Sequence, residues 1–90
     1  MTVFVVVPFN EQTAQALVAK IPLKYPKHYV LPRGGFLVAS EGTSKEVALS
    51  LGIDGTPNNS VGLVTSASGY WGAASNDLWE WIKQNWSAGL

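Results

Sequence analysis

The side chains that could carry chemistry in this chain are few, and the most reactive of them stand alone. The 90 residues contain no cysteine and a single histidine, His28. Thiolate catalysis, disulfides and cysteine-based zinc sites are therefore excluded. No second histidine and no cluster of carboxylates stands at metal-ligand spacing, so we expect neither a bound metal nor a cofactor.

Serine is common, but no serine lies in a motif that would activate it. The chain has no G-x-S-x-G elbow, no G-x-x-x-x-G-K-[ST] loop and no G-x-G-x-x-G after a strand. A Ser-His-Asp set would have to recruit the distant His28. We therefore predict that the protein is not an enzyme.

One loop has the composition of a small-ligand site. Residues 66–72 follow a predicted strand and combine hydroxyl groups, glycines and two aromatic rings. Together with the turn that carries the only arginine, this loop contains the parts of a nucleotide or phosphate pocket. Turn formation explains the same residue types, and ligand binding is kept as the alternative function. The residues assigned to this alternative are Arg33, Gly34, Ser66 and Ser68.

All four tryptophans lie within residues 71–90, and residues 1–70 contain none. A Trp side chain buries about 150–250 Å², and Tyr and Trp are over-represented among residues that anchor interfaces. We expect this region either to close the core or to hold a partner. The candidate partner-binding residues are Tyr70, Trp71, Trp79, Trp81 and Trp86.

Four stretches have the composition of β-strands. Residues 2–7 are apolar on both alternations, which is typical of a central strand covered on both faces. Residues 28–31 and 36–40 flank the turn 32–35, whose two glycines favour a tight hairpin. Residues 61–67 form the fourth strand, and its small residues indicate that something packs closely over it.

Terminal signals and apolar spacing predict three helices. Asn10 caps the first, which Pro22 is expected to end. The sequence Thr43–Glu46 is a capping box that opens the second, and Gly52 fits its C-terminal end. Ser75 caps the last helix. The first helix carries its apolar positions at Ala14, Leu17, Val18 and Ile21, and the last carries Leu78, Trp79, Ile82 and Trp86 on one stripe, with Trp81 beside it.

In chain order these elements read β-α-β-β-α-β with an extra C-terminal α-helix. This is the order of the ferredoxin-like fold, so we predict an α+β protein, one compact domain over residues 1–90, with an antiparallel sheet and two helices on one face. The other face then needs cover from the third helix or from another subunit. RNA-recognition modules share this order, but Gly35, Leu37 and Ser40 replace the base-stacking aromatics of their third strand.

The low charge and the short apolar stretches of the chain argue against nucleic acid and membranes as partners. Only 13% of residues are charged and the formal net charge is zero, whereas proteins that bind duplex nucleic acid usually carry a basic excess. No apolar stretch approaches the about 18 residues of a membrane span, and a cysteine-free chain suits a reducing cytoplasm. We therefore expect a cytoplasmic protein that contacts neither membrane nor nucleic acid.

These observations favour a non-catalytic interaction module that forms a homodimer. It would use its sheet face and its Trp-rich C-terminal helix to bind a partner protein, as an inhibitor or a scaffold does. The alternative is a protein that binds or sequesters a small anionic ligand through the loop 66–72 and Arg33.

Overall fold

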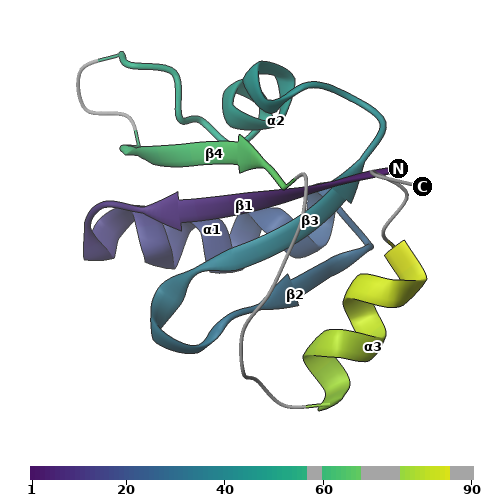
Figure 1. The fold of residues 1–90 in the computed structure, drawn as a ribbon. Helices are drawn as coiled ribbons and strands as arrows, with labels where there is room; N and C mark the ends of the chain where they lie inside the picture. The colour runs from purple at the N-terminus through teal and green to yellow at the C-terminus, as the bar shows by residue number, and fades with distance from the viewer. Residues whose placement is uncertain (57–59, 68–75, 86–90) are drawn as a thin grey trace.

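A computed structural model describes residues 1–56, 60–67 and 76–85 of the chain. Its sheet joins four strands in the order β2-β3-β1-β4, and every neighbouring pair is antiparallel (Figure 1). The described part of the chain is thus an α+β structure with three α-helices, as predicted. The elements are β1 (Thr2–Pro8), α1 (Glu11–Lys24), β2 (His28–Val30), a 3₁₀ turn (Pro32–Gly34), β3 (Phe36–Ser40), α2 (Ser44–Ser50), β4 (Gly62–Ser66) and α3 (Asn76–Asn85).

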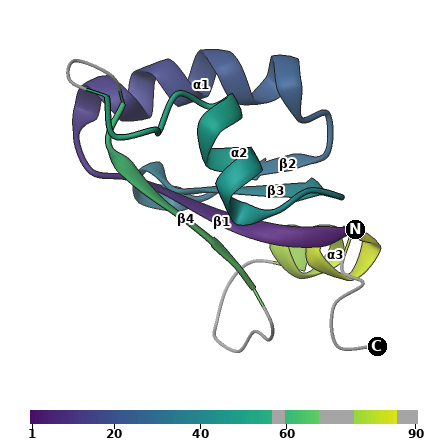
Figure 2. The same ribbon diagram turned by 90° about the horizontal axis from the view of Figure 1, so that it is seen from above.

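Helices lie on both faces of the sheet. Figure 2 shows α1 and α2 over one face, which we call the helix face, and α3 over the other, which we call the reverse face. Alternation along a strand divides the side chains between the two. Phe4 and Val6 point to the helix face, whereas Val3 and Val5 point to the reverse face. The two-sided apolarity of residues 2–7 therefore reflects cover on both sides.

Each face has its own apolar cluster. The larger one fills the space between the sheet, α1 and α2, and the smaller one lies under α3. The buried members of the larger cluster are Phe4, Val6, Leu17, Ile21, Phe36, Val38, Val47 and Leu51. Those of the smaller cluster are Val3, Leu37 and Ile82, with Val5, Tyr29, Leu31, Leu78, Trp79 and Trp81 packed against them.

Helix α1 begins as predicted, but its buried face differs from the predicted one. The Asn10 side chain accepts a hydrogen bond from the Thr13 amide at 2.8 Å. Thr13, rather than Val18, joins Leu17 and Ile21 on the buried face, and Val18 is exposed. The Thr13 hydroxyl explains why this residue is buried. Thr13 Oγ1 accepts a hydrogen bond from the Val61 amide at 3.0 Å, and this bond connects α1 to the residue before β4.

Pro22 does not end α1, which continues to Lys24. Proline removes one N–H donor from a helix, and at position 22 that loss leaves only the Val18 carbonyl without its intrahelical partner. The Tyr25 amide still bonds to the Ile21 carbonyl at 2.7 Å. Because Pro22 is exposed and lies in the last turn, α1 continues past it to Lys24.

The signals at both ends of α2 are confirmed. Thr43 Oγ1 accepts from the Glu46 amide, and Glu46 Oε1 accepts from the Thr43 amide. At the other end Gly52 has φ +80°. The Gly52 amide bonds to the Leu49 carbonyl and the Ile53 amide to the Ala48 carbonyl, which together form a Schellman motif.

Candidate functional site

The described tryptophans pack against their own sheet. Trp79 and Trp81 are half-buried and lie with Ile82 on the side of α3 that faces Val3 and Leu37. Their position gives them the first of the two roles expected from the sequence, which is to close the core. Trp86, Tyr70 and Trp71, the other candidate partner-binding residues, lie outside the described residues.

Two contacts attach α3 to the edge strand β2. The Tyr29 hydroxyl donates a hydrogen bond to Asp77 Oδ2 at 2.8 Å. The ring of Tyr29 also lies 6.2 Å from that of Trp81, centroid to centroid, with the planes tilted by 54°, a separation within the range of attractive aromatic pairs. Helix α3 is therefore held over β2, β3 and the start of β1.

Two residues of the alternative ligand site, Gly34 and Ser66, lie in the described part of the structure. Gly34 precedes β3, whose first residue, Phe36, pairs with Val6 near the C-terminal end of β1. Ser66 pairs with Phe4, toward the other end. The side chain of Arg33 and all of Ser68 lie outside the described part of the structure.

The polar groups around His28 have structural partners. His28 Nδ1 lies 2.8 Å from the carbonyl oxygen of Tyr25. The Tyr25 hydroxyl lies 2.6 Å from Ser50 Oγ, which itself donates to the Val47 carbonyl at 2.8 Å. This chain of hydrogen bonds links the end of α1 to α2. It contains no carboxylate that would orient a catalytic histidine.

Phe4 is not available for base stacking. It is buried on the helix face under α1 and α2, so no nucleotide can reach its ring. RNA-recognition modules stack bases on an open sheet face, and in this protein α3 covers part of the corresponding face.

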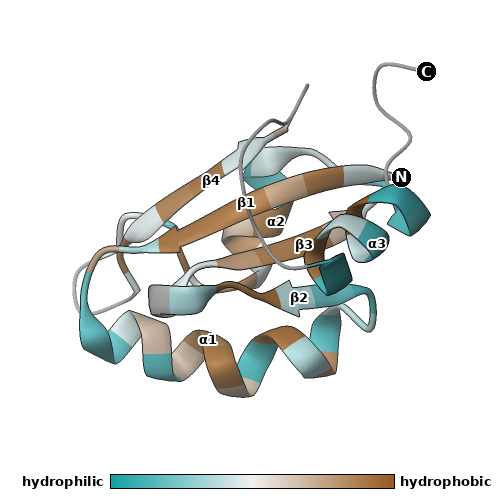
Figure 3. Ribbon diagram, turned by 60° about the horizontal axis from the view of Figure 1, so that its bottom comes forward, coloured by the Kyte–Doolittle hydropathy of each residue, from teal (hydrophilic) through white to brown (hydrophobic). Residues whose placement is uncertain are grey.

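An exposed apolar surface beside β1 and β4 was not predicted from the sequence. Val7 pairs with Leu63 across β1 and β4, and the Phe9 amide bonds to the Val61 carbonyl at 3.0 Å just beyond. The exposed fractions are 38% for Val7, 65% for Phe9, 43% for Val61 and 51% for Leu63. We call these four residues the β1–β4 patch. Figure 3 shows the apolar stretches of β1 and β4 beyond the reach of α3.

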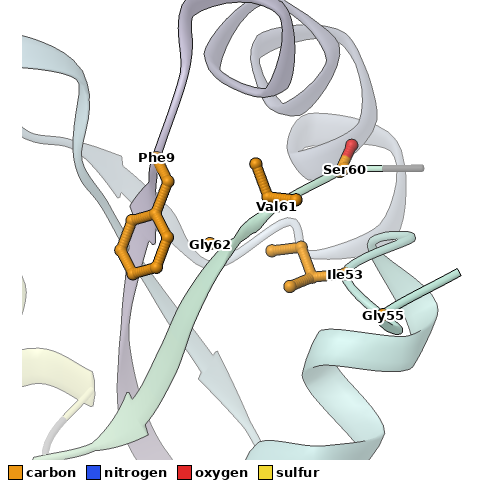
Figure 4. A pocket seen from close by; sticks show the side chains of 6 residues that line it. All are labelled: Phe9, Ile53, Gly55, Ser60, Val61 and Gly62. Atoms are coloured by element: carbon orange, nitrogen blue, oxygen red, sulfur yellow. The ribbon is translucent and has the colours of Figure 1, made fainter. Parts of the chain in front are cut away.

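A pocket of about 270 Å³ adjoins this patch. Phe9 and Val61 belong to both, and Ile53 and Ser60 complete the wall together with two glycines (Figure 4). None of the lining residues is charged. These lining residues therefore offer no charged group to a phosphate or nucleotide, and the pocket extends the apolar surface of the patch.

Comparison with protein-family models, with curated proteins and with solved structures finds no match. Within residues 1–56, 60–67 and 76–85, no three His, Asp or Glu side chains are grouped so that they could hold a metal ion. No helix in the described part of the chain is long and apolar enough to cross a bilayer.

Proposed function

We propose that the protein is a non-catalytic interaction module that forms a homodimer and presents the joined surface to a partner protein, in the manner of an inhibitor or scaffold. The observation that carries the proposal is the β1–β4 patch. Four large apolar side chains stand exposed on or next to two paired strands, although a third helix covers another part of the same face. Exposed apolar surface of this kind marks association sites.

The proposal assigns different roles to α3 and to the patch. Trp79 and Trp81 stabilise the reverse face from within the chain and shape the border of the free surface, and the patch makes the contact. This modifies the expectation that the tryptophans themselves insert into a partner. It agrees with the near absence of charge on β1 and β4, since interface cores are depleted in charged residues.

The free energy gained by burying the β1–β4 patch indicates that other contacts also contribute to the dimer. Full burial of a Val, Leu or Phe side chain contributes about 1.5–3 kcal/mol. With roughly half of each side chain exposed, covering all four contributes on the order of 4 kcal/mol per copy, or about 8 kcal/mol for the two copies of a homodimer. Association itself costs about 4–15 kcal/mol. A stable contact therefore needs further interactions next to the patch.

The fold assignment that accompanies this proposal is the ferredoxin-like one. It is supported by the strand order β2-β3-β1-β4, by antiparallel pairing throughout, and by α1 and α2 on one face. The proposed compartment is the cytoplasm, for which the absence of cysteine is the supporting observation.

Sedimentation velocity across the micromolar range tests the proposed function. We expect the 9.7 kDa chain to sediment as a species of twice that mass at the upper end of the range. The variant Leu63→Glu should shift the equilibrium to monomer, because it places a charge in the centre of the patch. Leu23→Glu is the matched control, since Leu23 is also an exposed leucine but lies on α1. A wild-type chain that stays monomeric throughout would contradict the proposal.

A further inference from the structure

The outer edge of β4 carries main-chain groups that the sheet does not use. The Phe9 amide bonds to the Val61 carbonyl and the Ala67 amide to the Val3 carbonyl. In an antiparallel ladder, bonded pairs alternate with non-bonded ones. The odd-numbered residues of β4 therefore turn their N–H and C=O groups toward β1. Those of Gly62, Val64 and Ser66 point away from the sheet, along the edge that faces the viewer in Figure 2.

The two edges of the sheet are unequally protected. The other edge strand, β2, has only three residues, and Pro26, Lys27 and Pro32 flank it. Short length, lysine and proline are the usual protection of a sheet edge against further pairing. The stretch 60–67, which contains β4, has neither a charged residue nor a proline. Within the described part of the chain, β4 is thus the edge strand that lacks these protecting features.

We propose that β4 pairs with the β4 of a second copy, antiparallel and centred on Val64, to give one continuous eight-stranded sheet across the dimer. This rests on the proposed function and specifies its interface. In this register Val64 faces the partner's Val64, and Gly62 faces the partner's Ser66. Each pair exchanges two N–H···O bonds, so every outward group of the strand gains a partner.

The side chains of β4 and α2 suit a two-fold partner. Across the new pairing, Leu63 lies opposite the partner's Thr65 and Val61 opposite the partner's Ala67, so the β1–β4 patches of the two copies lie on the same face of the joined sheet and form one larger apolar surface. No like charges meet, because the strand has none and the chain as a whole is neutral. Helix α2 packs against β4, and Lys45 and Glu46 at its start give it no net charge to repel its symmetry mate.

Amide hydrogen exchange of the wild-type chain tests this register directly. Leu63 and Thr65 bond within the sheet, so their amides should exchange slowly at every concentration. The amides of Val64 and Ser66 should exchange rapidly at low micromolar concentration and at least about tenfold more slowly at millimolar concentration, where the dimer is populated. The neighbouring inward amides serve as the internal control.

A pair of variants at Ser66 isolates the main-chain contribution. Ser66→Pro removes an outward N–H while leaving the bonds to β1 intact, and Ser66→Ala keeps that N–H. The dimer loses two hydrogen bonds in the first variant, so we expect its Kd to rise roughly tenfold or more. The Ala variant should stay within about twofold of wild type. The thermal midpoint of both, measured at a concentration where the chain is monomeric, reports whether the fold is intact.

These experiments distinguish a failure of the β4 pairing from a failure of the proposed homodimer. A dimer whose Val64 and Ser66 amides remain unprotected would overturn the β4 pairing and leave the proposed function standing. A chain that never dimerises would overturn both. Concentration-dependent protection of the outward amides, together with a weaker Ser66→Pro dimer, would establish the pairing.

Discussion

At the scale of single residues, Gly62 is the position where the sheet tolerates least change. A Cβ atom there would lie 2.5 Å from the carbonyl oxygen of Val7 and 3.3 Å from the Cα of Pro8. Both atoms belong to the backbone of the neighbouring strand, which cannot rotate aside. The small residues of the fourth strand were expected to mark a close approach, and here the approaching group is the main chain of β1.

We therefore predict that Gly62→Ala destabilises the monomer by about 1–3 kcal/mol, the usual cost of forcing atoms into a packed site. Urea unfolding followed by far-ultraviolet circular dichroism at low concentration measures the change. The control is Gly42→Ala, whose added methyl would meet the side chain of Glu46, at 3.3 Å, rather than a main-chain atom. A Gly62→Ala chain as stable as the control would show that β1 and β4 can separate without cost.

At the scale of elements, α3 buries fewer side chains than α1, whose Thr13, Leu17 and Ile21 are all buried. Its only fully buried side chain among the described residues is Ile82, aided by the Tyr29–Asp77 hydrogen bond and the half-buried tryptophans. Elements that bury little apolar area open at a lower free energy than the core. Helix α3 should thus detach before the sheet unfolds.

The variant Ile82→Ala should make α3 detach at a lower urea concentration than the one that unfolds the sheet. Removing a buried Ile side chain costs about 2–5 kcal/mol, and here the loss falls on the attachment of α3. All tryptophans lie in residues 71–90, so their emission reports on this region. We expect the emission to shift at lower urea than the circular dichroism signal. In Ile21→Ala, which opens the core under α1, the two signals should move together, and coincident signals in Ile82→Ala would contradict the prediction.

Element by element, the sequence predicted what depends on neighbours along the chain and failed where distant contacts decide. The Asn10 cap, the Thr43–Glu46 box and the Gly52 ending are confirmed because each is closed by residues a few positions away. The prediction that Val18 belongs to the buried face of α1 was wrong, because Thr13 is buried there through its hydrogen bond to Val61, 48 residues on. The β1–β4 patch was not predicted either, because its exposure depends on where α3, a distant segment of the chain, packs on the sheet.

At the scale of the whole molecule, the two faces of the sheet are covered to different extents. The helix face holds a closed apolar cluster between two helices, and the reverse face is covered over β2 and β3 but open beside β4. A 90-residue chain has little stability to spare, because it buries only about 60–65% of its unfolded surface. Association that covers the open part would therefore contribute a measurable share of the total stability.

Linkage then predicts that thermal stability depends on protein concentration. A dimer that dissociates on unfolding gains stability by mass action as the concentration rises. For a domain of this size we expect the midpoint to rise by about 3–5 °C for each tenfold increase in concentration, as measured by calorimetry. The midpoint of Leu63→Glu, held monomeric by the charge in the patch, should not move, whereas that of Leu23→Glu should move as in the wild type. A midpoint independent of concentration in all three chains would mean that the open part of the reverse face adds nothing to stability through self-association.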